Sequence, residues 1–273
     1  MKTKAPAKAN KASNVFAALT IILCLIIGYC LWNYVMGNPA NFQGGDRSKL
    51  PLDGNILGMI FKGGYIVPIL MGMLLMTIVF SIERFFVLNR AEGRGSLDKF
   101  VSAVKGKIAD GDMAGAKAMC DKQRGSVANV INAALVKYDE VKAEGFDSEK
   151  AAEMIGKEVE DATSLEMPSL EKNMTIISTM VSIGTLFGLL GTVTGMIRAF
   201  AGLSAAGAPD QAQLATGISE ALVNTATGIG TSIIATIAYN FFTSKIDTLT
   251  YFIDESGSAI TQAYRKLRAT AKK

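Results

Sequence analysis

Three polar residues lie inside two long apolar stretches of this chain. The stretches are Thr175–Leu203 and Thr216–Phe242. Thr192 lies in the first, and Glu220 and Thr225 lie in the second. An ionised side chain at the middle of a bilayer costs about 2.5–3.5 kcal/mol on insertion scales, so Glu220 is expected to face protein or water rather than lipid. Hydroxyls and a carboxylate along a groove between two apolar helices can solvate a proton or a cation. The pattern therefore predicts a polar groove between two membrane helices, which is a candidate ion path.

Further polar residues follow Glu220 at helical spacing. Positions i+4, i+7 and i+11 from Glu220 share its helix face, and they are Asn224, Thr227 and Thr231. Thr185, in the first stretch, lies seven residues before Thr192 on the same face. We treat these four residues as secondary candidates for the lining of the path.

Helix packing is the competing interpretation of these residues. Small residues let helices approach closely in lipid, and Ser and Thr hydroxyls can bond back to their own helix. Packing explains the many glycines and the hydroxyl of Thr227 well, and for Thr192 and Thr225 the pattern leaves both interpretations open. It explains Glu220 least, because packing does not require a carboxyl group.

The composition excludes most enzyme chemistry. The chain has 273 residues and no histidine, which removes the usual acid–base group at neutral pH and the commonest metal ligand. Its three cysteines have neither metal-ligand nor disulfide-framework spacing. No nucleophile elbow, phosphate loop or basic patch with interleaved aromatics is present. We therefore expect no enzyme activity, no cofactor, no metal and no nucleic-acid partner.

Four apolar runs are long enough to cross a bilayer, which takes about 20 residues. A composition of 49% hydrophobic and 19% charged residues fits membrane spans that alternate with polar segments. The runs are Val15–Met36, Gly63–Leu88, Thr175–Leu203 and Thr216–Phe242. The first is longer than the apolar core of a signal peptide and no clean cleavage site follows it, so we interpret it as an uncleaved anchor helix.

The spans divide the chain into five segments. Residues 1–62 contain the N-terminal tail, the first span and the connection after it, and residues 63–88 form the second span. Residues 89–172 are a water-soluble helical region, residues 173–244 contain the paired spans, and residues 245–273 form a C-terminal helix. Lysines precede the first span and arginines follow the second, whereas residues 204–215 contain neither. The positive-inside rule then places both termini and residues 89–172 in the cytoplasm.

Local signals define the helices outside the membrane. Within 89–172 the pattern predicts four, at about Leu97–Ala109, Met113–Asp121 and Ser126–Glu144, and from near Asp147 to an interruption at Pro168. The C-terminal segment has an apolar stripe with approximately heptad spacing, at Ile246, Leu249, Ile253, Ile260, Tyr264 and Leu267. Glu83 and Arg84 close the second span, and we expect an interfacial pair in which Arg84 reaches toward the headgroups.

Two motifs in the paired spans resemble those of a known family. Residues 188–197 have the sequence GLLGTVTGMI, residues 220–228 have the sequence EALVNTATG, and Tyr239-Asn240 follows. Together they resemble the MotA/TolQ/ExbB proton-channel family, in particular its ExbB/TolQ branch. Gly63-Gly64, Pro68 and Glu83-Arg84 also resemble the family's first helix, so the similarity covers about residues 60–250.

The resemblance implies an all-α, polytopic subunit of the bacterial inner membrane. Such subunits form a ring, a pentamer in this branch, around two single-span partners of the ExbD/TolR type. The partner carries the membrane aspartate that binds the translocated proton, and in the ExbB case the work passes to a TonB-type protein that opens outer-membrane transporters. The family's pore threonines correspond to Thr192 and Thr225, and its membrane glutamate to Glu220. The Val15–Met36 span is additional to the family's three-helix plan.

Several alternatives stay open at this point. A TolQ-type or gliding-type motor would have the same mechanism and another output. Sodium could replace the proton, because Asn224, Thr227 and Thr231 add polarity where the family has small apolar residues. A membrane scaffold without ion flow is a rival of another class. A secondary transporter is disfavoured, since no inverted repeat and no substrate-sized set of polar groups is present.

Overall fold

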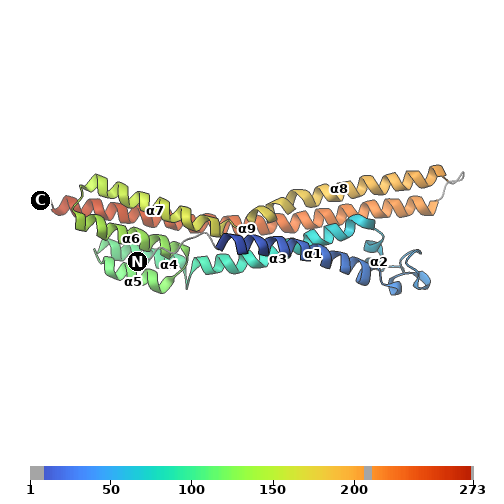
Figure 1. Ribbon diagram of the computed structural model, residues 1–273, viewed down its shortest axis with the longest axis horizontal. Coiled ribbons are helices and arrows are strands. Elements are labelled where there is room, and N and C mark those ends of the chain that lie inside the picture. Colours follow the sequence, from blue (N-terminus) through green and yellow to red (C-terminus); the bar gives the residue numbers. More distant parts are fainter. Residues whose placement is uncertain (1–8, 206–210, 272–273) are drawn as a thin grey trace. The chain divides into compact units, whose positions relative to one another are not determined.

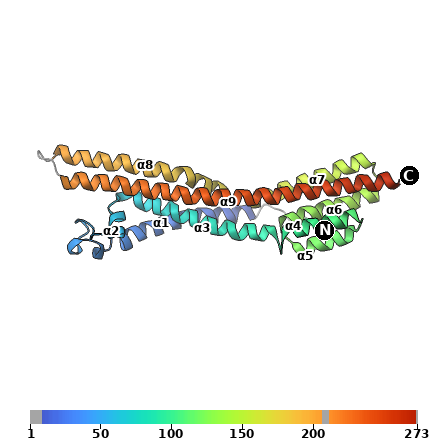
Figure 2. The same cartoon turned by 180° about the vertical axis from the view of Figure 1, so that it is seen from behind.

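The computed structural model describes residues 9–205 and 211–271, and every regular element within these ranges is helical (Figures 1 and 2). The chain forms two compact units, Met1–Ile82 with Asn173–Tyr239 and Glu83–Lys172 with Asn240–Lys273. Helices α3 (Val67–Glu92) and α9 (Gln211–Ala271) contribute residues to both units. The predicted all-α class is confirmed.

The first unit contains most of the apolar helix segments that could cross a membrane. Four helices of the described residues are long and apolar enough to cross a membrane, and they lie within Val15–Met36, Gly64–Ala109, Met174–Ala201 and Leu214–Lys266. The four predicted spans are thus confirmed by length and composition. Between 17% and 44% of each apolar window is buried within the protein, which leaves most of their surface for lipid or for other protein chains.

Helix α1 (Ala9–Cys30) packs closely against α3 and continues as a π-helical segment, Leu31–Met36. The contact depends on the missing side chain of Gly28, because a Cβ atom there would lie 2.6 Å from the Gly72 nitrogen and 2.8 Å from the Pro68 oxygen. Small residues at such contacts let helix backbones approach in lipid. The additional N-terminal span is therefore an integral part of the first unit.

The connection from α1 to α3 is folded rather than extended. It contains short 3-10 turns, a single β-bridge between Phe42 and Pro51, and the short helix α2 (Ile56–Phe61). Trp32 is buried against α2, where its indole stacks on Phe61 at 4.7 Å between ring centroids. Asn41 donates hydrogen bonds to the Val35 and Met36 carbonyls, each at 2.9 Å, and so satisfies backbone acceptors at the end of the π-helical segment.

The second unit is a helical bundle whose boundaries follow the sequence signals closely. It contains helices α4 (Leu97–Ala109), α5 (Met113–Gln123), α6 (Ser126–Glu144) and α7 (Ser148–Leu170). Asp112 and Asp147 are the N-caps of α5 and α7, and Gly145 ends α6 with a left-handed φ of 73°. The helices predicted from glycine punctuation and apolar spacing are confirmed.

The C-terminal part of α9 packs against this bundle through its apolar stripe. The predicted residues Ile246, Leu249, Ile253, Ile260 and Tyr264 are all buried, whereas the side chain of Leu267 lies outside the described residues. The rings of Tyr264 and Tyr138 meet edge to face at 5.1 Å. Ser256 is fully buried within the stripe, and its hydroxyl donates to the Phe252 carbonyl of its own helix at 2.7 Å.

Candidate functional site

Helix α8 (Met174–Ala205) and the first part of α9 lie side by side (Figures 1 and 2), and glycines bring their backbones into contact. A Cβ atom on Gly188 would lie 3.2 Å from the Gly228 Cα, and one on Gly195 would lie 2.9 Å from the Ala221 nitrogen. The two helices run antiparallel, because Gly195 faces Ala221 and Gly184 faces Ser232. This close approach places polar side chains of the two helices within hydrogen-bonding distance.

The predicted pair of threonines meets across this contact. The Thr192 and Thr225 hydroxyls form a short hydrogen bond in which either can be the donor. Thr225 can also donate to the Ala221 carbonyl at 3.1 Å, and Thr192 to the Gly188 carbonyl at 3.3 Å. Because each hydroxyl has one proton, one threonine donates to the other while the second donates to a helix carbonyl. Both side chains are half-buried, so the pair is open on one side.

The secondary candidates do not behave alike. Thr185 donates to the Ser232 hydroxyl at 2.9 Å and forms a second hydroxyl pair between α8 and α9. Thr227 and Thr231 instead donate to carbonyls of their own helix, those of Val223 at 2.8 Å and Thr227 at 2.9 Å. Thr185 thus forms a cross-helix contact like that of Thr192 and Thr225, whereas the bonds of Thr227 and Thr231 within α9 fit helix packing.

Glu220 forms an ion pair with Arg198. The Arg198 guanidinium donates to the Glu220 carboxylate at 2.6 Å, and the Glu220 side chain is only 10% exposed. Gly64, with a φ of 77°, makes room for this pair, because a Cβ atom there would lie 2.9 Å from the Glu220 carboxyl carbon. Arg198 also lies over the ring of Tyr65, 5.8 Å from its centroid. The sequence left Arg198 undecided between headgroups and a carboxylate, and the structure pairs it with the carboxylate.

Asn224 connects three parts of the first unit. Its amide nitrogen donates to the Gly63 carbonyl at 2.8 Å, just before α3. Its side chain occupies the space above Gly191 on α8, where an added Cβ atom would lie 2.6 Å from the Asn224 amide carbon. The side chain is fully buried, and within the described residues its amide oxygen has no hydrogen-bond partner. Sequence spacing placed Asn224 on the Glu220 stripe, but only the fold reveals the backbone of Gly63 as its partner.

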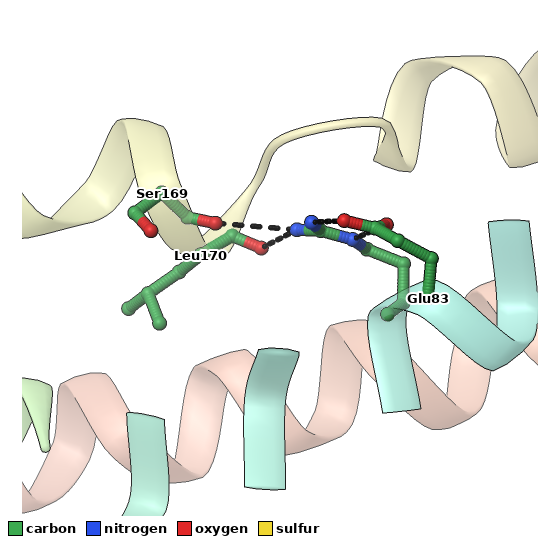
Figure 3. Close-up of polar contacts among 4 residues, drawn as sticks. Glu83, Ser169 and Leu170 are labelled. Atoms are coloured by element: carbon green, nitrogen blue, oxygen red, sulfur yellow. Dashed lines mark hydrogen bonds and ion pairs between the residues drawn. The ribbon is translucent and has the colours of Figure 1, made fainter. Parts of the chain in front are cut away.

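The expected Glu83–Arg84 pair forms and belongs to the second unit, but its surroundings differ from the expectation. Arg84 is 1% exposed and donates to the Glu83 carboxylate at 2.6 and 2.5 Å. It also donates to the carbonyls of Ser169 and Leu170 (labelled in Figure 3), at 3.2 Å each. The expectation that Arg84 reaches toward headgroups is wrong, because α7 ends just after Pro168 and its last carbonyls need a donor.

Reactive side chains are scarce in the described residues. Burial, with a smaller contribution from Asp121, raises the pKa of the Cys120 thiol to about 12, so this cysteine is a neutral thiol at physiological pH. No group of three or more His, Cys, Asp or Glu side chains in the described part of the chain is placed to hold a metal ion. The chemistry that the first unit offers is hydrogen bonding and charge pairing inside a membrane.

Comparison with known proteins gives a family for this arrangement. Residues 123–255, which include Thr192, Glu220 and Thr225, match the MotA/TolQ/ExbB proton channel family. The match covers about half of the chain and includes the whole contact between α8 and the first part of α9. The four apolar helices and the similarity to ExbB and TolQ proteins together support a multi-pass protein of the inner membrane.

Relatives with curated names come from both parts of the ExbB/TolQ branch. The Tol-Pal system protein TolQ of Pseudomonas aeruginosa is 35% identical over 105 residues, which are 38% of this chain and 46% of the relative. A putative biopolymer transport protein, ExbB-like 3, of Synechocystis is 34% identical over 110 residues, 40% of this chain and 52% of the relative. The biopolymer transport protein ExbB of Helicobacter pylori is 38% identical over 89 residues, 33% of this chain and 59% of the relative. The chain thus spans about half the length of these relatives.

Proposed function

We propose that this protein is a ring-forming subunit of an ion-driven motor of the ExbB/TolQ type, with α8 and α9 lining one half of a proton path. The observation that carries the proposal is the cross-helix hydrogen bond between Thr192 and Thr225, on the same helix pair as the ion pair of Glu220 with Arg198. The match to a proton-channel family supports it independently.

The hydroxyl pair suits a path whose titrating group comes from elsewhere. A threonine hydroxyl can both donate and accept, so the pair can solvate a carboxyl group in either protonation state. The chain has no histidine, and its carboxylate within the paired spans, Glu220, is engaged by Arg198. In our proposal the missing group is a carboxylate on a single-span partner of the ExbD/TolR type, two copies of which stand inside a ring of five subunits.

Arg198 and Glu220 then have an electrostatic rather than a proton-carrying role. An ion pair that is partly shielded from water presents little net charge to an approaching proton, while it leaves local dipoles that orient hydroxyls and water. The proposed path therefore runs past Glu220 to the Thr192–Thr225 pair. Sodium as the coupling ion is the alternative, and a pH gradient imposed on sodium-free vesicles containing the assembled complex tests it directly.

The output of the motor has two candidates. Relatives named ExbB favour energised transport through a TonB-type protein, and relatives named TolQ favour a Tol-Pal system. The paired motifs of α8 and α9 are common to both types; we propose the ExbB-type output and keep the Tol-Pal output as the alternative. Restoration of siderophore uptake in cells that lack their own ExbB supports it, whereas restoration of outer-membrane integrity in cells that lack TolQ would select the alternative.

Isosteric removal of the hydroxyls tests the ion path itself. Thr225→Val keeps the shape of the side chain and removes its hydroxyl, so we expect motor-dependent uptake to fall by about tenfold or more while membrane level and assembly are retained. Thr236→Val is the matched control, since its hydroxyl donates to the Ser232 carbonyl of its own helix at 2.7 Å and its side chain is exposed. Full uptake in the Thr192→Val/Thr225→Val double variant would favour a scaffold without ion flow.

A further inference from the structure

A positively charged pocket lies beside the Arg198–Glu220 pair. It has a volume of about 530 Å³ and lies between the folded connection of residues 37–62 and the adjoining ends of α8 and α9. Its lining includes the cationic side chains Lys49, Lys62 and Arg198 and one carboxylate, Glu220. The lining therefore has a surplus of positive charge.

The cations of this pocket are incompletely neutralised. Lys62 donates to two neutral acceptors, the Arg47 carbonyl at 2.9 Å and the Ser48 carbonyl at 3.0 Å. Burial lowers the pKa of Lys62, and the nearby Asp46 carboxylate opposes that shift only in part. Arg198 uses one guanidinium nitrogen for Glu220, which leaves further donors in its planar fork. A ligand that brings negative charge and several acceptor oxygens would complement this set.

The position of the pocket indicates where such a ligand comes from. Arg198 is near the end of the apolar helix segment Met174–Ala201, and Gly64 begins another such segment. The pocket therefore adjoins the ends of two apolar segments, where lipid headgroups are expected. Two exposed apolar side chains adjoin these cations and form what we call the apolar rim: Leu50, a lining residue, is 59% exposed, and Tyr65, over whose ring Arg198 lies, is 73% exposed. A charged cavity next to an apolar surface fits a molecule with an anionic head and an acyl tail.

We propose that this pocket binds the phosphate of an anionic phospholipid, with Lys49, Lys62 and Arg198 as its ligands and the acyl chains lying against the apolar rim. Phosphodiester oxygens accept hydrogen bonds from lysine and, in bidentate fashion, from arginine. Free inorganic phosphate offers the same acceptor oxygens but has no acyl chain. Only the phospholipid can therefore use the apolar rim.

The bound phosphate would compete with Glu220 for Arg198. Lipid occupancy would then weaken the hold of Arg198 on the carboxylate and change the charge at the start of the proposed path. This regulatory consequence rests on the proposed function, whereas the binding of lipid does not.

The single tryptophan of the chain provides a reporter for the test. Trp32 stacks on Phe61, next to Lys62, and its ring lies 6.1 Å from that of Tyr65, over which Arg198 lies. The full chain is placed in nanodiscs, and Trp32 quenching is titrated with brominated phosphatidylglycerol or with brominated phosphatidylethanolamine. We expect the anionic lipid to bind about tenfold more tightly, as expected for several cations acting on one phosphate.

Variants of Lys49 make the test specific. Lys62 donates hydrogen bonds to the connection. Lys49 instead acts on the Asp46 carboxylate through its charge, so we expect the fold to tolerate its substitution better. Lys49→Gln is expected to weaken binding of phosphatidylglycerol about fivefold, because one lysine near anionic lipid contributes about that much to affinity. Lys49→Glu should weaken it further. Lys122→Gln, on an exposed face of α5, is the control with the same change in charge.

Three results would overturn the proposal. The first is equal binding of the two lipids, and the second is unchanged binding in both Lys49 variants. The third is displacement of brominated phosphatidylglycerol by inorganic phosphate at equal concentration, which would assign the pocket to a soluble anion. Loss of lipid preference in Lys49→Glu with full motor output would leave the proposed function standing, and loss of output in Thr225→Val with normal lipid binding would leave the pocket standing.

Discussion

Arg84 is an example of a buried charge that uses nearly all of its hydrogen-bonding capacity. Its Nε and one terminal nitrogen serve the Glu83 carboxylate, and the other terminal nitrogen serves the Ser169 and Leu170 carbonyls. The planar fork of a guanidinium can reach a carboxylate on one side and two carbonyls on the other, which an ammonium cannot. One side chain thus joins the end of α3 to the end of α7.

Replacement of Arg84 is expected to destabilise the second unit. Arg84→Met leaves the Ser169 carbonyl and the buried Leu170 carbonyl without this donor and Glu83 without its cation, so we expect a loss of about 2–4 kcal/mol in unfolding free energy. Arg84→Lys should restore only part of it. Pulse proteolysis in detergent, which reports the unfolded population, measures the loss.

Arg90→Met is the matched control for Arg84, because Arg90 is an exposed arginine of the same helix. Equal stability of Arg84→Met and Arg90→Met would contradict the capping role of Arg84.

Sequence reasoning identified the polar residues of the site more successfully than their partners. Helical spacing alone grouped Glu220 with Asn224, because a periodicity of 3.6 fixes which residues share a face. It could not assign Asn224 to the Gly63 carbonyl, 161 residues away in the chain. Helical spacing also could not decide whether Arg198 pairs with a lipid headgroup or with a carboxylate, because that depends on the distance between two helices.

At the scale of helices, the missing side chains of glycines determine how closely α8 and α9 approach. Gly228 and Gly230 are two residues apart on α9 and differ sharply in surroundings. A Cβ atom on Gly228 would lie 2.6 Å from the Gly184 oxygen and 2.7 Å from the Gly188 Cα, whereas one on Gly230 would have nothing within 4 Å. Backbone atoms cannot move aside as a flexible side chain can, so the first position has no space for a methyl group.

This difference predicts opposite effects for the same substitution. Gly228→Ala should push α9 away from α8, lower stability by about 1–3 kcal/mol and break the Thr192–Thr225 hydrogen bond. Gly230→Ala should be neutral or stabilising by up to about 1 kcal/mol, because alanine favours a helix. Thermal denaturation in detergent measures both, and a normal melting temperature for Gly228→Ala would show that the helices are not held at backbone contact.

The sequence predicted regular elements well and the irregular connection poorly. Helices α4 to α7 were predicted to within a few residues, because glycines and aspartates that cap them are local signals. The connection of residues 37–62 has no periodicity, and its fold depends on contacts between distant groups, such as Asn41 with the Val35 carbonyl and Trp32 with Phe61. The pocket of Lys49 and Lys62 could therefore not be anticipated from the sequence.

At the scale of the whole molecule, much apolar surface of the paired helices faces outward. Leu186, Val193 and Ile197 of α8 are 56–62% exposed, and Leu222, Ile233 and Ile237 of α9 are 54–66% exposed. Such surface has to be covered by lipid or by further protein chains. A ring of identical subunits would cover part of it and leave the rest to the bilayer.

Native mass spectrometry of the complex purified from membranes tests this assembly. We expect five copies of the chain with two copies of a small single-span protein, because a path that lacks its titrating carboxylate requires a partner. Co-expression without the partner gene is the control and should leave a ring with no small subunit. A monomer, or a dimer without a partner, would contradict the proposed motor.

In the contact of Asn224 with Gly63, a side chain donates to a main-chain carbonyl. Mutation of the two residues should therefore affect this hydrogen bond differently. Every residue type at position 63 retains the carbonyl acceptor, whereas a single change at position 224 removes the donor. Side chains at position 63 are limited by space alone, since a Cβ atom there would lie 2.9 Å from Val223 Cγ1. In a population of variants, tolerance at position 63 would thus depend on volume, and tolerance at position 224 on chemistry.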